Sequence, residues 1–434
     1  MPKVGITPEM MASMRARVGR VLRIDHSVSN EEVTRLAIIR FCEGIGDPNP
    51  LWCDPDYGAS GPFGTQVGPP SWVICAFAGL QFGWPGLGSF HCGSELEFHS
   101  PVCVGDVIRA ECVYEGFDGP KPARFAERVV VDHFTNRYHN QLGVLVATIR
   151  WSVLNFERGR TRQPIREPAA ATLPHPWTEA ELLALEAEVR VERPLGRTPR
   201  WWDDVDVGQP LTTIVKGPLG MTDEIAYVAA GGAPIPRLAA HRSALHSYDR
   251  HPAWAFRDPV SGALEPIYAV HYNKSAAMAM GVPLQYDVGF QRQCWQVHLL
   301  TDWLGDDGWL LACGAEYRAF VYHGDVLRLG GQVVAKRIDE RGEAVVDIQT
   351  HAINQRGLDV MPGHARVALP RRGEAYSPAR RRARARPRPC SLRRRPMMNP
   401  CGDCAASTSI PGPESYLPCE PTIPAIVTRA AQAA

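Results

Sequence analysis

The sequence predicts an α+β protein made of two tandem copies of one unit, in which a helix, a polar loop and a buried helix precede an antiparallel sheet. Two observations support this. Each half changes from helical periodicity to alternating apolar and polar residues, and short sequences recur at a nearly constant offset. GDVIR begins at Gly105 and GDVLR at Gly324, an offset of 219, while NQLG at Asn140 and NQRG at Asn354 are 214 apart.

The first helix is predicted in SNEEVTRLAIIRFCEGIG, residues 29–46. Ser29 or Asn30 can cap it, and Glu31 and Glu32 suit its first turn. A loop rich in Asp, Pro and Gly follows.

A second, apolar helix is predicted in PPSWVICAFAGL, with Val73, Ile74, Phe77 and Leu80 in the core. The alternating segments GDVIRAECVY, FAERVVVDHF and GVLVATIRW then indicate antiparallel strands. The N-terminal unit is placed at residues 1–160.

Residues 161–200 are expected to form a linker with the acidic helix TEAELLALEAEVR, and residues 201–370 the second unit. The helix start at Met221 lies only 192 residues after Ser29, so the second half carries about 27 additional residues. These are assigned to an insertion at 233–264, a candidate lid or channel wall. The buried helix of this half should contribute a core set of apolar residues: Trp295, Val297, Leu299 and Leu300.

The last segment, residues 371–434, has a different composition from the rest. It holds twelve Arg and four acidic residues, a net charge of +8, so the overall +1 leaves about −7 on residues 1–370. We expect a disordered tail and a mildly acidic body that does not bind nucleic acid. The best apolar run, at 67–80, is too short and too Pro-interrupted for a membrane span, and a cytoplasmic protein is expected. The twelve scattered cysteines are interpreted as reduced, apolar thiols, and CGDC at 401–404 as a weak metal signal.

Three motifs resemble a known family: GDPNPLWCDPDYG, FHSPVCVGDVI and HYNKSAAMAMGVPLQYDVG. The chain resembles the MaoC-like, double-hotdog enoyl-CoA hydratases and dehydratases over residues 20–370, with a first half like the dehydratase domain of type I fatty-acid synthase. The resemblance implies tandem hotdogs, each an antiparallel sheet wrapped around a buried helix, that form a pseudo-dimer. It also implies a hydro-lyase that reversibly adds water to a trans-2-enoyl-CoA, giving a 3-hydroxyacyl-CoA.

That reaction needs a base for water, an acid for the α-carbon and donors for the enolate oxygen. In the family, an Asp and a His five residues later share the proton work. A glycine N–H at the start of the buried helix binds the oxygen, aided by the helix dipole. The resemblance implies no cofactor and no metal beyond the CoA thioester substrate, no membrane partner, and either a homodimer of pseudo-dimers or a partner hotdog subunit.

In the first half, Asp47 and Asn49 match the motif, but Trp52 stands at the base position. Pro70 stands at the donor position and has no N–H. The first site is therefore predicted to be non-catalytic. Trp52 and Asp47 are substrate-binding candidates, with packing of the indole and loop-holding by the carboxylate as the alternatives.

In the second half, the offset of 219 places His271 at the base position and Gly289 at the donor position. Pro266 occupies the Asp position, with Glu265 beside it, and Asn273 follows His271 by two residues. His271, Glu265 and Gly289 are the catalytic candidates, and Asn273 is a further substrate-binding candidate.

The carboxylate that assists His271 stays open at this point, because Asp258 or Asp249 in the insertion could replace Glu265. Aromatic residues in and after the insertion favour a bulky acyl group. Two other functions are compatible with the sequence: a non-catalytic acyl-thioester-binding subunit and a hotdog thioesterase.

Overall fold

The computed structural model describes residues 5–22, 30–76, 84, 86–123, 126–157, 172–232, 242–250, 252 and 255–373. They fall within one compact unit, Met1–Arg388. The predictions for Ser29, Phe77, Leu80 and most of the Arg-rich tail lie outside the described residues.

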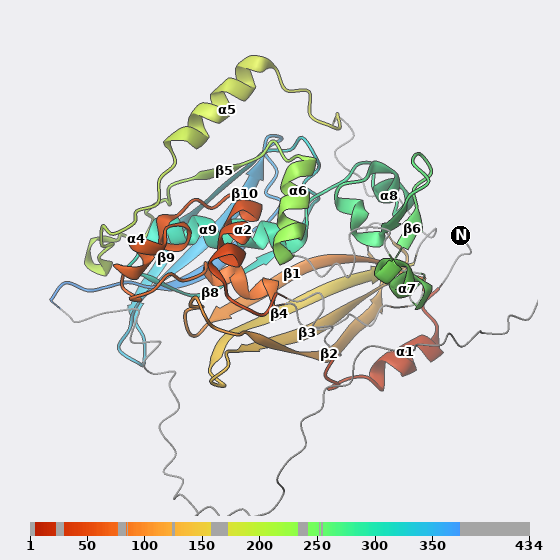
Figure 1. Cartoon of the computed structure of the whole chain (residues 1–434), viewed down its shortest axis with the longest axis horizontal. Helices are drawn as coiled ribbons and strands as arrows, with labels where there is room; N and C mark the ends of the chain where they lie inside the picture. Colours follow the sequence, from red (N-terminus) through yellow and green to blue (C-terminus); the bar gives the residue numbers. More distant parts are fainter. Residues whose placement is uncertain are drawn as a thin grey trace, which may run out of the picture. The chain divides into compact units, whose positions relative to one another are not determined.

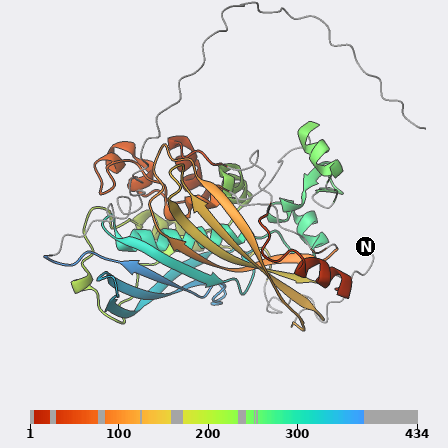
Figure 2. The same cartoon turned by 90° about the horizontal axis from the view of Figure 1, so that it is seen from below.

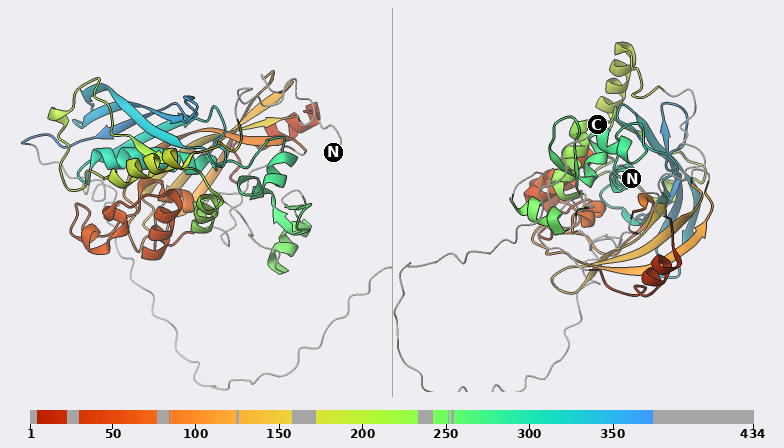
Figure 3. Two further views of the ribbon diagram at one scale, coloured as in Figure 1. Left: turned by 90° about the horizontal axis from the view of Figure 1, so that it is seen from above. Right: turned by 90° about the vertical axis from the view of Figure 1, so that its right-hand side faces the viewer.

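A single curved sheet of nine strands organises the described structure, in the order β2-β3-β4-β1-β8-β11-β10-β9-β5. Four strands of the first half and five of the second form its two arms, and helices cover its inner face (Figures 1, 2 and 3). The strands are β1 Gly88–Phe98, β2 Arg109–Lys121, β3 Val129–His139, β4 Leu145–Phe156, β5 Ile214–Lys216, β8 Trp309–Glu316, β9 Leu327–Ile338, β10 Ala344–Asn354 and β11 Gly363–Ala368. The predicted tandem hotdog fold is confirmed, with the two sheets joined into one.

The two arms meet where β1 pairs antiparallel with β8, and this pairing has two-fold symmetry under the offset of 219. Glu95 pairs with Gly314, which is its own equivalent. The pairs Gly93–Glu316 and Glu97–Ala312 are images of each other. Register is strict because a one-residue slip would turn every side chain to the other face. The halves are therefore superposable along this seam.

The recurring turns occupy equivalent places. Gly105 and Gly324 have φ of 90° and 87°, the left-handed region that favours glycine. Asn140 Oδ1 accepts hydrogen bonds from the backbone N–H groups two and four residues later, and Asn354 Oδ1 does the same. The repeats thus mark the same hairpin ends in both halves.

The helices of the first half are α1 Pro8–Arg15, α2 Arg35–Ile45, α3 Pro50–Cys53, α4 Pro55–Ala59 and the 3-10 helix η2 Pro70–Cys75. The predicted first helix exists as α2, but its predicted cap is wrong. Thr34 caps it through Ala37 N, because Glu32 forms a β-bridge with Val107 and is held extended. The predicted apolar helix is seen as η2, and Val73 and Ile74 are buried as expected.

The second half and the preceding linker contain α5 Glu179–Val191, η3 Trp202–Asp204, α6 Met221–Tyr227, η4 Val228–Gly232, α7 Arg242–Arg250, η6 Ile267–His271, α8 Lys274–Ala279 and α9 Gly289–Leu304. The acidic linker helix is α5, capped by Thr178. The insertion contains α7 and the hairpin of β6 Ala255–Arg257 with β7 Leu264–Pro266. The buried helix is α9, and its predicted core residues are all buried: Trp295, Val297, Leu299 and Leu300.

Two simpler expectations concern thiols and membranes. None of the eight cysteines among the described residues is in a disulfide, and six of them are buried. Among the described helices, none has the length and the apolar run that crossing a bilayer requires.

Leu300→Ala should lower the free energy of unfolding by about 2–5 kcal/mol, because it leaves a cavity around a fully buried side chain of α9. Urea unfolding of the full chain measures this change. The matched control is Leu183→Ala on α5, where the side chain is 57% exposed, and it should shift stability by less than about 0.5 kcal/mol. Equal effects of the two variants would show that α9 is not the centre of the core.

Candidate functional site

The first-half loop is closed around Asp47. The indole N–H of Trp52 donates to Asp47 Oδ2 over 2.9 Å, and the backbone N–H of Asn49 donates to Asp47 Oδ1 over 3.0 Å. Asp47 and Trp52 are both buried. Trp52, which stands at the predicted base position, therefore donates a hydrogen bond that holds the Asp47 carboxylate in place.

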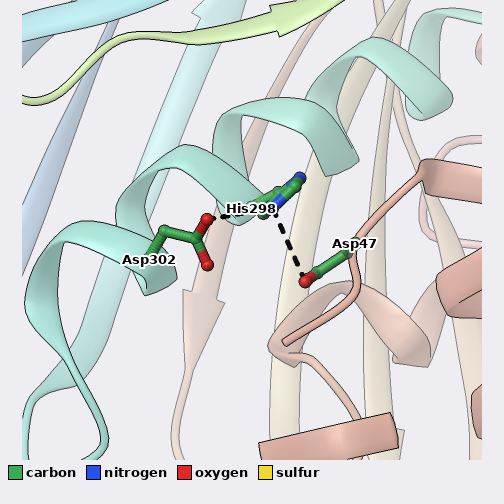
Figure 4. A group of neighbouring side chains, drawn as sticks. All are labelled: Asp47, His298 and Asp302. Atoms are coloured by element: carbon green, nitrogen blue, oxygen red, sulfur yellow. Dashed lines mark ion pairs between the residues drawn. The ribbon is translucent and has the colours of Figure 1, made fainter. Parts of the chain in front are cut away.

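Three residues of the second half complete this cluster, and two of them, His298 and Asp302, are shown with Asp47 in Figure 4. His298 and Asp302 lie one turn apart on α9, and His298 Nε2 is 3.1 Å from Asp302 Oδ2 and 3.6 Å from Asp47 Oδ1. Lys216 of β5 brings its Nζ to 2.8 Å from His298 Nδ1. The same Nζ donates to the carbonyls of Ile45 and Gly46 at the end of α2, over 3.0 and 2.7 Å. We call Asp47, Lys216, His298 and Asp302 the ionic clasp, because it joins the two halves.

The contacts of the ionic clasp fix the tautomer of His298. An ammonium can only donate, so Nδ1 accepts from Lys216, and Nε2 carries the proton that is donated to Asp302. Burial lowers the pKa of His298 to about 3 and that of Lys216 to about 8, and burial raises the pKa of Asp302 to about 6. The imidazole is therefore neutral and both of its nitrogens are engaged.

Asp47, His298 and Asp302 offer ligand atoms within 4.8 Å of one another, which is compatible with a metal ion. A metal would need the lone pair of His298 Nε2 and would move the proton to Nδ1. A proton on Nδ1 would then point at the Lys216 ammonium, 2.8 Å away. Both groups would be hydrogen-bond donors, so they would repel each other. Lys216 already supplies the buried positive charge, so these residues do not fit a metal site while the lysine is charged.

The space beside Trp52 is too small for an acyl chain. A cavity of about 40 Å³ lies there, lined by residues of both halves that include Trp52, Pro70, Phe98 and Leu310. Such a volume holds a few waters at most. The first-half site therefore lacks room for substrate as well as a base and a donor.

The equivalent positions in the second-half site carry different chemistry. The offset of 219 relates Trp52 to His271, Pro70 to Gly289 and Phe98 to Tyr317. From the other half, Leu310 corresponds to His91. The four first-half residues are apolar or, in the case of Pro70, lack a backbone N–H. Their equivalents in the second-half site are histidines, a tyrosine and a glycine.

His271 ends η6 and is held beside the loop that enters α9. Its Nδ1 is 2.8 Å from the carbonyl oxygen of Tyr286, which can only accept, so Nδ1 carries the proton, and Nε2 keeps a lone pair to which no described residue donates a hydrogen bond. The backbone carbonyl of His271 accepts from His323 Nε2 over 2.8 Å. Burial lowers the pKa of His271, so a neutral imidazole with base character results.

Gly289 begins α9, whose N-cap Val288 offers no side-chain hydrogen bond. A Cβ at Gly289 would lie 2.9 Å from His91 Nδ1 and 3.0 Å from the Tyr317 ring, so only glycine fits there. The first amides of a helix have no acceptor within the helix, and the dipole favours negative charge beside them. His271 thus bonds the backbone of Tyr286, three residues before Gly289.

Two further groups, which the sequence reasoning missed, border Gly289. His91 Nε2 lies 3.2 Å from Gly93 O and 2.8 Å from Ser94 Oγ, so it carries the proton and Nδ1 keeps its lone pair. The Tyr317 hydroxyl donates to Gln293 Oε1 over 2.9 Å and lies 3.4 Å from Ser94 Oγ. The signal was available, because the offset applied backwards from Leu310 gives His91.

The carboxylate candidates are not brought to His271. Glu265 lies on β7 opposite Phe256, and among the described residues it makes no hydrogen bond or ion pair with His271. Asp258 binds its own turn and accepts from Asn273 Nδ2 over 2.6 Å. Asn273 in turn caps α8, and Asp249 is exposed on α7.

Asp287, which directly precedes the α9 N-cap, is also engaged. Its two oxygens accept from Arg292 Nη2 and Nε over 2.6 and 2.7 Å, and both side chains are buried. A bidentate pair of this kind leaves the carboxylate committed to the guanidinium.

The fold and the two pseudo-equivalent sites define a double-hotdog protein. Comparison with solved structures agrees. A MaoC-like dehydratase matches with a TM-score of 0.56 at 16% identity, covering 82% of this chain and 99% of that one. A MaoC domain protein dehydratase from Chloroflexus aurantiacus gives 0.51 at 12% identity, covering 82% and 96%.

Sequence comparisons support the same family. Residues 18–149 match the model of the FAS1-like, dehydratase domain region. A Thermomonospora curvata protein named "Probable enoyl-CoA hydratase alpha subunit" is 26% identical over 36% of this chain and 55% of its own length. The (R)-specific enoyl-CoA hydratase of Aeromonas caviae is 29% identical over 32% of this chain and 94% of its own. The chain thus spans about half the length of the first relative, and the predicted resemblance to MaoC-like hotdog hydratases is confirmed.

Asp302→Asn should make the slope of the free energy of unfolding against pH more positive than in the wild type between about pH 4 and 6. Because burial raises the pKa of Asp302 to about 6, this carboxyl holds more protons in the folded than in the unfolded state in this window. Its own contribution to the free energy of unfolding therefore falls as pH rises, opposite in sign to that of His298, whose pKa is lowered, and the amide removes only the Asp302 contribution. Urea unfolding at several pH values compares the two slopes, and identical slopes would contradict a buried, titrating Asp302.

Proposed function

We propose that the chain is a hydro-lyase that reversibly adds water to a trans-2-enoyl-CoA to give a 3-hydroxyacyl-CoA, and that its second-half site is the active one. The observation that carries this proposal is the neutral His271, with a free Nε2 lone pair, beside the uncapped start of α9 at Gly289. The names of the Thermomonospora and Aeromonas relatives support the reaction class.

The proposed chemistry uses the two groups in separate roles. The backbone N–H of Gly289 binds the oxygen of the thioester carbonyl, which becomes negative in the enolate, and the α9 dipole adds to this stabilisation. His271 Nε2 takes a proton from the attacking water. The Tyr286 carbonyl, at His271 Nδ1, stabilises the imidazolium that forms.

The first-half loop and Asn273 of the second half have structural roles in this proposal. Asp47 and Trp52 are held within the loop and the ionic clasp, and Asn273 caps α8. We propose that these three residues shape the protein and do not bind substrate. Glu265 is no longer proposed as the partner of His271, because it lies in the β6–β7 hairpin opposite Phe256 and no hydrogen bond or ion pair joins it to His271 among the described residues.

The acyl group is proposed to be bulky. An aromatic cluster lies beyond His271, with the Tyr268 ring 5.3 Å and the Tyr286 ring 5.0 Å from the imidazole. Phe90 and Phe320 extend the cluster from Tyr286. Flat apolar faces of this kind favour large or cyclic acyl groups over short linear ones.

His271→Ala should lower the hydration rate of the best enoyl-CoA by about a hundredfold to ten-thousandfold, because the general base is lost. The rate is followed by mass spectrometry of the products from a panel of enoyl-CoAs of different acyl size. His133→Ala on β3, a partly exposed histidine bonded to Ser152 and Asp118, is the control and should keep wild-type rates.

The same assay separates the other functions. A wild type that binds enoyl-CoA tightly without hydrating it would replace the proposal with a binding subunit. Release of free CoA thiol would replace it with a thioesterase. Hydration by His271→Ala at the wild-type rate would remove the second-half site from the reaction.

A further inference from the structure

We propose that His91, delivered from the first half, is the second acceptor for the attacking water in the second-half site and replaces the loop carboxylate that this half lacks. This inference rests on the proposed function. Pro266 stands where the loop carboxylate would be, and the neighbouring acids Asp258 and Asp287 are engaged elsewhere. Glu224 is buried near Asp287 and the α9 N-cap, but burial raises its pKa well above the usual range, so it is protonated and is not a carboxylate acceptor.

The place of His91 follows from the two-fold seam between β1 and β8. In β1 the register with β4 shifts at Cys92, and in β8 the register with β11 shifts at Leu311. These two positions are 219 residues apart, so both halves carry the same bulge. The residue just before each bulge, His91 or Leu310, therefore reaches the site of the opposite half.

The cavity beside Trp52 shows where the position shared by Leu310 and His91 lies relative to the start of the buried helix. Leu310 lines that cavity together with Pro70, the equivalent of Gly289. In the second-half site the equivalent pair is in contact, because His91 Nδ1 would lie 2.9 Å from a Cβ on Gly289. His91 therefore occupies the wall that faces the start of α9.

The orientation of His91 is fixed in a form that accepts a hydrogen bond. The Gly93 carbonyl accepts the Nε2 proton, and Ser94, in turn near the Tyr317 hydroxyl, supports it. Nδ1 is left with its lone pair toward Gly289. The rings of Phe290 and Tyr317, at 4.4 and 4.8 Å, hold the imidazole on two sides.

A water held by two acceptors presents an oxygen lone pair to the substrate. One O–H donates to His271 Nε2 and the other to His91 Nδ1. The C3–O bond then forms, the π pair of C2=C3 moves to the thioester oxygen at Gly289 N–H, and the first proton passes to His271. When the enolate collapses, His271 returns this proton to C2, so one water is added and both histidines are restored.

The closing experiment compares His91→Leu, His91→Asn and Leu310→His in the full chain. His91→Leu installs the residue that the first-half site carries at this position, so it should fold. We expect kcat to fall about a hundredfold, the scale of a misplaced reacting group, with KM changed less than threefold. His91→Asn can present a side-chain oxygen near the place of Nδ1 and should recover about tenfold of the loss. Leu310→His should keep wild-type kinetics, since it alters only the closed site.

The activity of the wild type and that of His91→Leu together separate a failure of this inference from a failure of the proposed function. If wild type hydrates no enoyl-CoA, the function itself falls. If wild type is active and His91→Leu retains its kcat, His91 is not an acceptor for water although the function stands. A loss of kcat in His91→Leu that His91→Asn does not reduce, or that is accompanied by a lower Tm, would assign His91 a packing role and overturn the inference.

Discussion

The antiparallel pairing of β1 with β8 is the constraint on which the rest of the structure depends. Because Glu95 pairs with its own equivalent Gly314, each arm of the sheet is the image of the other, and every residue of β1 near the seam has a counterpart on β8. The bulges at Cys92 and Leu311 then direct one side chain from each half into the site of the other half. Residues of both halves therefore meet in each of the two equivalent places, Leu310 beside Pro70 and His91 beside Gly289.

Because the two halves share one backbone plan, the different side chains at equivalent positions show how the two sites differ in chemistry. The first-half site has become an ionic clasp and a small apolar cavity, in which Trp52 holds Asp47 and Lys216 supplies the buried charge. Breaking a buried ionic cluster is costly while keeping it gains little. The clasp is thus best understood as a device that fixes the contact between α2, β5 and α9. At the equivalent positions the second-half site carries histidine, tyrosine and glycine, to which our proposal assigns proton transfer and enolate binding.

Sequence reasoning gave the repeat, the buried helix α9 and the shared position of His271 and Gly289, because these depend on periodicity and on a constant offset. It failed at the cap of α2, where a tertiary bridge of Glu32 outweighs local capping preference. The role of Glu265 stays a prediction, because the sequence does not show that this residue lies in the β6–β7 hairpin opposite Phe256.

Neither the ionic clasp nor His91 was predicted. The ionic clasp joins residues from three separate segments and has no local signature. His91 was accessible in principle, but only by applying the offset to a strand of the opposite half. Composite sites of this kind require the pairing register before a sequence offset can identify their residues.

The central claim is that substrate binds at the start of α9, between a loop histidine of the second half and a strand histidine of the first. A crystal structure of the wild-type chain with a bound 3-hydroxyacyl-CoA tests it most directly. The claim predicts the thioester oxygen within hydrogen-bond distance of Gly289 N, and the 3-hydroxyl oxygen between His271 Nε2 and His91 Nδ1. A ligand bound beside Trp52 and Pro70, or with its 3-hydroxyl turned away from both histidines, would contradict it.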